Sequence, residues 1–121
     1  MRKRKRTKGI SRKALDILWS KHIHSIYNET CAICGSQDRC AAHHVRSRRF
    51  NNTRWNLENG ILICIRCHFK AHKDYEWFRR EYINLHGEKR LNYLWKESQK
   101  IVKVDKIFLE KIKEKLEKEA E

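Results

Sequence analysis

The sequence predicts an α+β fold in which two short strands and a helix are joined by a four-cysteine clip and flanked by helices. Two pairs of cysteines with the same Cys-x2-Cys spacing frame the centre of the chain, at Cys31 and Cys34 and at Cys64 and Cys67. Short apolar runs lie between the pairs, and apolar residues at helical intervals precede and follow them. A chain of 121 residues fits one domain, whose small core a metal staple would stabilise.

The N-terminal segment predicts a flexible basic arm over residues 1–10, followed by a helix. Cations dominate the arm, and no residue between Met1 and Ile10 offers an apolar side chain for packing. Ser11 is the expected N-cap, and the helix should end near Asn28. The apolar residues that recur at intervals of three and four are Leu15, Leu18, Trp19, Ile23, Ile26 and Tyr27.

Two strands and a long helix are expected in the centre. The first strand should run over residues 40–45, and the second over residues 61–63, after the turn signal Asn59-Gly60. One helix should begin within residues 64–67 and continue to about Gly87. The organisation expected is the arm, a metal-clipped domain with its leading helix over residues 11–87, and a helical extension over residues 88–121 that serves as packing or partner surface.

The four paired cysteines predict a structural zinc ion, because four thiolates complete a tetrahedral site without an open position. An odd total of five cysteines argues against a disulfide framework. The alternative ligand set is Cys31, Cys34, Cys40 and His43, which would leave the second pair without a partner. In the four-cysteine reading, Cys40 is a buried thiol on the strand.

The histidines near the clip exceed what one zinc ion needs and indicate a second metal site. His68 and His72 lie four residues apart, so on a helix they project from one face and can hold the same ion. The alternative is a helix surface that carries two histidines by chance. Histidine titrates near neutral pH, so His44 suits a general base.

The charge of the chain predicts an acidic polymer as partner. Lys and Arg number 29 against 15 Asp and Glu, a formal charge of +14, and nucleic acid is the first expectation. No run approaches the roughly 18 apolar residues of a membrane span, and no apolar stretch follows the basic N-terminus as in a signal peptide. We therefore expect a cytosolic protein without a membrane partner.

The order of these motifs over residues 31–72 resembles the HNH nucleases, whose name is spelled here by His44, Asn59 and His68. The stretch from Arg54 to Ile61 is most similar to small phage-borne members, including the Rap/NinG recombination type. The motifs that carry the resemblance are Cys31-x2-Cys34, Ala42-His43-His44-Val45, Trp55-Asn56-Leu57-Glu58-Asn59-Gly60-Ile61 and Cys64-x2-Cys67-His68-x3-His72.

The resemblance implies a ββα-metal (HNH) core and a phage- or mobile-element-borne DNA endonuclease that acts on branched or recombining DNA in the cytosol or nucleoid of a bacterial host. It implies His44 as general base, Asn59 as the residue that orients it, and His43, His68 and His72 as ligands of one catalytic divalent ion. His68 thereby also counts as catalytic. Magnesium or manganese is the expected ion, with zinc or another ion as the alternative.

Contacts to DNA are expected from two basic segments, and they should make binding sensitive to salt. The candidates are Arg46, Arg48, Arg49 and Arg54 in the loop, and Arg2, Lys3, Arg4, Lys5 and Arg6 in the arm. A protein partner or a second copy of the chain would bind the C-terminal helices. The alternative function is a non-catalytic, zinc-stabilised DNA-binding module or an adaptor in a phage recombination or packaging complex.

Overall fold

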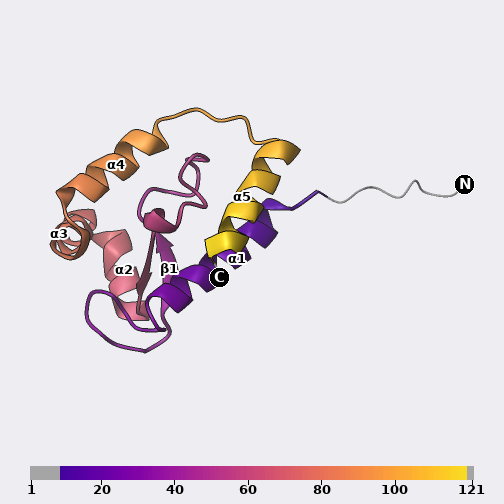
Figure 1. Cartoon of the computed structure of the whole chain (residues 1–121). Helices are drawn as coiled ribbons and strands as arrows, with labels where there is room; N and C mark the ends of the chain where they lie inside the picture. Colours follow the sequence, from indigo (N-terminus) through magenta and orange to yellow (C-terminus); the bar gives the residue numbers. More distant parts are fainter. Residues whose placement is uncertain (1–8, 120–121) are drawn as a thin grey trace, which may run out of the picture.

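The structure, a computed structural model, describes residues 9–119. It combines helices with a small two-stranded sheet, which confirms the predicted α+β class. Its elements are α1 (Arg12–Ile26), β1 (Ala41–His44), the short 3-10 helix η1 (Leu57–Asn59), β2 (Gly60–Ile63), α2 (Ile65–Lys73), α3 (Tyr75–His86), α4 (Glu88–Ser98) and α5 (Lys106–Glu119) (Figure 1).

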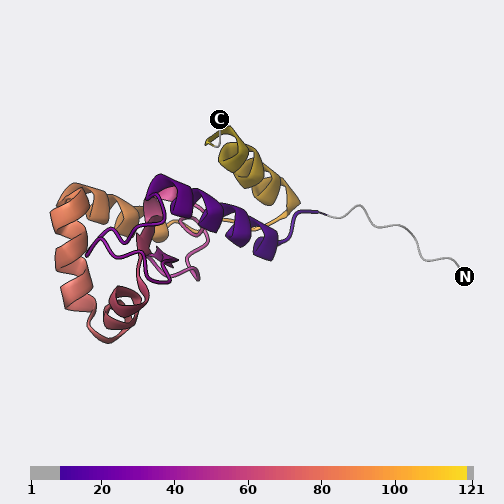
Figure 2. The same ribbon diagram turned by 90° about the horizontal axis from the view of Figure 1, so that it is seen from below.

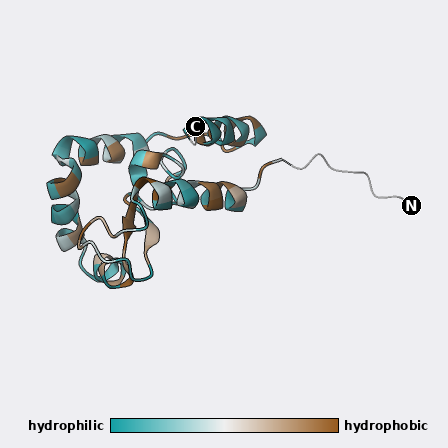
Figure 3. Ribbon diagram, turned by 60° about the horizontal axis from the view of Figure 1, so that its bottom comes forward, coloured by the Kyte–Doolittle hydropathy of each residue, from teal (hydrophilic) through white to brown (hydrophobic). Residues whose placement is uncertain are grey.

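The two strands form an antiparallel hairpin that lies between two groups of helices. His43 pairs with Ile61 and His44 with Gly60. Since side chains alternate along a strand, the hairpin has two faces. Ile61 and Ile63 belong to a core with α2, α3 and α4, whereas Leu62 belongs to a second core with α1 and α5. The hydrophobic strand β2 accordingly runs through the interior, and the helices alternate polar and apolar residues (Figure 3).

Helix α1 forms as its sequence predicts, with Ser11 accepting a hydrogen bond from the backbone N–H of Ala14 at 3.0 Å. Its buried residues face the hairpin, and Gly60 permits the close approach. A Cβ on Gly60 would lie 2.7 Å from Cζ2 of Trp19 and closer still to Ile23. The helix ends at Ile26, two residues before the predicted end.

The single helix predicted from Cys64 to Gly87 is in fact two helices. Asp74 interrupts it with non-helical backbone torsions (φ −133°, ψ 84°), and its carboxylate accepts from the backbone N–H of Trp77 at 3.1 Å, capping α3. Apolar periodicity continues across the break, which explains the wrong prediction. The predicted end at Gly87 is confirmed, at a φ of +88° that favours glycine.

The C-terminal helices pack onto both faces of the hairpin. Leu91 and Leu94 of α4 lie in the same core as Phe78, and Leu116 of α5 lies in the core of Trp19. Figures 1 and 2 show α5 beside α1, which it reaches through the connection over residues 99–105. The predicted division near Gly87 therefore crosses one continuous core.

The predicted arm contacts of Arg2, Lys3, Arg4, Lys5 and Arg6 lie outside the described residues. Within residues 9–119, no helix has both the length and the apolar character that a membrane crossing requires.

Candidate functional site

Two Cys-x2-Cys segments bring four thiols together. Cys31 and Cys34 lie in the turn after α1, while Cys64 immediately precedes α2 and Cys67 lies in its first turn. All four Sγ atoms lie within 4.8 Å of one another, and those of Cys34 and Cys64 are 3.5 Å apart. A tetrahedral zinc ion with Zn–S bonds of about 2.3 Å requires S···S separations near 3.8 Å. The cluster thus fits the predicted structural zinc ion.

Backbone amides favour thiolate at this cluster. Burial by itself raises the pKa of Cys31, but hydrogen bonds from the backbone N–H groups of Cys34 and Cys64 bring it to about 7. Burial and the neighbouring thiols raise the pKa of Cys67. A zinc ion at the centre of the cluster would supply a positive charge that offsets the repulsion between neighbouring thiolates.

The alternative ligand set with Cys40 and His43 is not assembled. Cys40 is partly exposed, in contrast to the buried thiol predicted, and its Sγ donates to the backbone oxygen of Ser36 at 3.3 Å. The imidazole of His43 instead lies with those of His68 and His72.

These three histidines form the second cluster, one from β1 and two from successive turns of α2. Their ring nitrogens lie within 4.8 Å of one another, and the Nε2 atoms of His68 and His72 are 3.2 Å apart. His43 is held edge-on against Phe78, with ring centroids 5.0 Å apart. An ion held by three protein ligands would keep coordination positions open, as catalytic metal sites require.

Burial favours the neutral form of His43 and His68. It lowers the pKa of His43 to about 3, an effect that the nearby His68 and His72 reinforce. Burial also lowers the pKa of His68, with His72 as the second cause. Neutral imidazoles keep the lone pairs that bind a metal ion.

His44 occupies the opposite face of β1. Its Nε2 lies 3.0 Å from the backbone oxygen of Arg54 and its ring stacks on that of Trp19 at 3.9 Å and 9°. Since a carbonyl only accepts, Nε2 carries the hydrogen and Nδ1 has the free lone pair. Burial lowers the pKa of His44, against the effects of the Arg54 carbonyl and the Asp16 carboxylate. His44 is therefore neutral at physiological pH and able to accept a proton.

Asn59 holds the loop that follows His44. Its side chain is fully buried; Oδ1 accepts from the backbone N–H of Arg46 at 2.7 Å and Nδ2 donates to the backbone oxygen of Arg46 at 3.0 Å. The backbone N–H of Val45 also donates to the backbone oxygen of Asn59 at 2.8 Å. Asn59 thus fixes the two residues after His44.

The four predicted loop arginines lie in three environments. Arg48 and Arg49 are exposed. The Arg46 guanidinium lies 3.5 Å from the ring centre of Trp95, which is 43% exposed. Arg54 is largely buried and paired with Asp16, so its charge is already engaged.

Sequence reasoning missed Asp16. Its carboxylate accepts from Nε and Nη2 of Arg54 at 3.0 and 2.7 Å and from Nε1 of Trp55 at 2.8 Å. It therefore fixes the segment whose carbonyl holds His44. An acid among the polar positions of an amphipathic helix gives no signal of such a role.

Comparisons of the chain with protein-family models, with curated proteins and with solved structures give no match, so the two clusters are interpreted from their own geometry.

Proposed function

We propose that the protein is a metal-dependent DNA endonuclease of the HNH type, stabilised by a zinc ion on the four cysteines. The observation that carries the proposal is the open cluster of His43, His68 and His72 beside His44, whose Nδ1 is free to accept a proton. The brace that Asn59 forms with the following loop also supports it.

His44 would act as general base. Its Nδ1 would accept a proton from the attacking water, while the Nε2–H bond to the Arg54 carbonyl keeps the tautomer and stabilises the imidazolium. An ion on the three imidazoles would supply Lewis-acid stabilisation of the phosphate and of the leaving oxygen. His43 and His44 leave β1 on opposite faces, so the phosphate would lie at the end of the strand, where it can reach both.

The donor set refines the expected ion. Imidazole nitrogens suit zinc, nickel or iron, whereas magnesium prefers oxygen ligands at octahedral positions. We therefore propose a transition-metal ion in place of the magnesium or manganese that the resemblance implied.

The proposed substrate is duplex DNA held by its phosphates. Arg48 and Arg49 expose their guanidinium groups in the loop after β1, near the proposed position of the phosphate, and the whole chain carries a formal charge of +14. Branched or recombining DNA remains the proposed preference, and a phage or mobile element the proposed source.

The test is nicking of supercoiled plasmid by zinc-loaded protein with nickel, zinc, manganese, magnesium or chelator. His44→Ala should abolish metal-dependent nicking and leave zinc content and DNA binding unchanged. His86→Ala, which removes an imidazole from the end of α3, is the matched control and should retain activity. An active His44→Ala protein would refute the proposed base, and binding without cleavage in every metal would favour the non-catalytic module or adaptor.

A further inference from the structure

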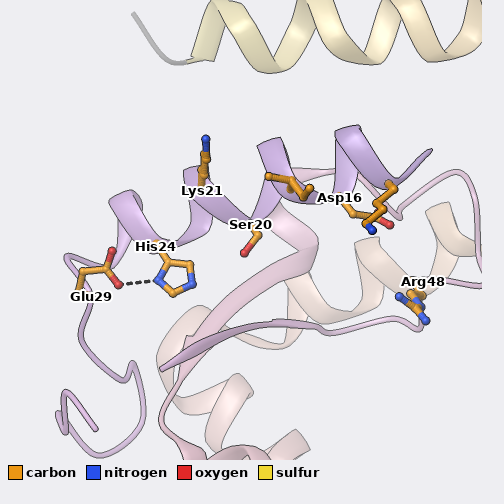
Figure 4. Close-up of a pocket in the computed structure, with 8 residues that line it drawn as sticks. Asp16, Ser20, Lys21, His24, Glu29 and Arg48 are labelled. Carbon is orange, nitrogen blue, oxygen red and sulfur yellow. Dashed lines mark hydrogen bonds and ion pairs between the residues drawn. The ribbon is translucent and has the colours of Figure 1, made fainter. Parts of the chain in front are cut away.

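An open groove of about 550 Å³ runs along the exposed side of α1 (Figure 4). Residues from neither metal cluster line it. Its lining includes Lys13, Asp16, Ile17, Lys21 and Arg48. All except Arg48 come from α1, and Arg48 extends from the loop after β1.

The free charge of the groove is positive. Among the described residues, Lys13, Lys21 and Arg48 form no ion pair. Of the two acids in the lining, Asp16 is paired with the cation of Arg54, whereas Glu29 is hydrogen-bonded to His24, an imidazole that is charged only when protonated. Three cations without an ion pair therefore lie in the lining of one groove against one such carboxylate, a favourable balance for a polyanion.

The groove adjoins the support of the proposed base. Asp16, in its wall, binds Arg54, whose backbone oxygen is hydrogen-bonded to His44. The buried side of the same helix carries Trp19, on which the His44 ring stacks. A strand that enters the groove would thus pass close to His44.

The spacing of the cations suits a nucleic-acid backbone. Lys13 and Lys21 are eight residues apart on α1, which corresponds to about 12 Å along the helix axis. Phosphates of a duplex strand advance by about 3.4 Å each along the axis, so the two lysines span roughly three to four nucleotides. Ile17, 50% exposed between them, offers an apolar contact for sugars.

We propose that this groove binds the phosphate backbone of duplex DNA beside the cleaved position, through Lys13, Lys21 and Arg48. The inference rests on the proposed nuclease function for its position relative to cleavage. It assigns to α1, outside the motif-bearing residues 31–72, a second task besides supporting His44.

The test uses Lys13→Glu/Lys21→Glu in the inactive His44→Ala background. Affinity for a labelled duplex of about 20 base pairs is titrated at several salt concentrations. We expect affinity to fall at least about tenfold near 0.1 M salt, and the slope of log affinity against log salt to become shallower by about two. The control is Arg80→Glu/Lys89→Glu, which makes the same charge change at exposed positions on α3 and α4. It should change the affinity and the slope against salt much less.

Three results would separate the two proposals. Equal binding by the groove variant and its control overturns the groove, whether or not the wild-type protein cleaves DNA. Weakened binding by the groove variant, with no cleavage by the wild type in any metal, overturns the nuclease and keeps the groove. If the groove variant binds duplex RNA more weakly but binds duplex DNA as well as its control does, the assignment to DNA is overturned. Unchanged thermal unfolding confirms intact variants, and Arg48→Glu tests the opposite wall independently.

Discussion

The surroundings of His44 give this imidazole properties that its sequence position does not show. The Arg54 carbonyl fixes its tautomer, Trp19 covers one ring face, and burial lowers its pKa. Asp16 acts on His44 indirectly. It holds Arg54 in place, and its negative charge opposes the lowering of the His44 pKa. The reactivity of one residue thus depends on a carboxylate almost thirty positions earlier in the chain.

The pH dependence of cleavage should reflect this arrangement. The proposed base is active when neutral and its pKa is below 6.5, so the rate should be constant near pH 7 and fall as pH drops through the lowered pKa. Asp16→Asn removes a charge that raises this pKa, so the acid limb should move to lower pH and kcat should fall. Asp38→Asn, at an exposed pair with Arg39, is the control for kcat measured from pH 5 to 8. An acid limb that does not move in Asp16→Asn would contradict the effect of Asp16 on the pKa of the proposed base.

Asn59 should contribute to stability as well as to the site. Asn59→Ala leaves the backbone N–H and oxygen of Arg46 without their partners, at a cost of about 1–3 kcal/mol for each buried group. Urea unfolding of the zinc-loaded variant should therefore show a loss of about 2–4 kcal/mol. Asn92→Ala, exposed on α4, should change stability by less than about 0.5 kcal/mol. Similar losses of unfolding free energy in the two variants would contradict the role of Asn59 in holding the loop.

Among the elements, the junction of β2 and α2 carries much of the site. Cys64 and Cys67 lie at the start of α2, and His68 and His72 follow on the same helix. The cysteine turn after α1 is tied to this junction by the clip, and the backbone N–H of Ala32 also donates to the Leu62 oxygen at 2.8 Å. Zinc should therefore set the position of the helix that carries two imidazoles of the second cluster.

Removal of one clip ligand should release the structural zinc. Cys34→Ser should lower zinc content by one ion per chain, whereas Cys40→Ser should leave it unchanged, because Cys40 lies outside the cluster. Metal analysis after dialysis gives the stoichiometry, and circular dichroism should show loss of helix in Cys34→Ser. The zinc contribution expected from zinc-finger peptides is about 10–16 kcal/mol in apparent binding energy. Zinc loss from Cys40→Ser would restore the Cys3His alternative.

Across the whole molecule, the hairpin lies between two cores, and helices from both ends of the chain complete them. Leu15 of α1 and Leu116 of α5 share one core, whereas Leu91 and Leu94 of α4 close the other around His43 and Phe78. Truncation near Gly87 would remove both α4 and α5 and expose both cores. We therefore expect it to damage the metal sites as well as to remove any partner surface on the C-terminal helices.

A matched pair of leucines tests this dependence. Leu94→Ala, fully buried on α4, should lower the free energy of unfolding by about 2–5 kcal/mol through lost contacts and a cavity. Leu85→Ala, 44% exposed on α3, should cost less than about 1 kcal/mol. Denaturant unfolding of both zinc-loaded variants provides the comparison, and equal effects would place α4 outside the cooperative core.

Local patterns in the sequence determined the parts of the molecule that depend on neighbouring residues. Ser11 predicted the start of α1, the repeated Cys-x2-Cys spacing predicted which thiols meet, and the interval between His68 and His72 placed both on one helical face. These features follow from helix geometry and from the reach of a metal ion over a few residues. The HNH assignment itself stays a prediction for the cleavage assay.

Only the tertiary structure decided the features that join distant segments. Asp74 ends α2 although the apolar period continues, Asp16 pairs with Arg54, and Trp95 stacks beneath Arg46 at the surface. A polar or aromatic residue on an amphipathic helix has the same sequence pattern whether water or a distant side chain contacts it. The choice between the two depends on which loop the folded hairpin brings against that helix, and this long-range packing set the surroundings of His44 and formed the basic groove beside it.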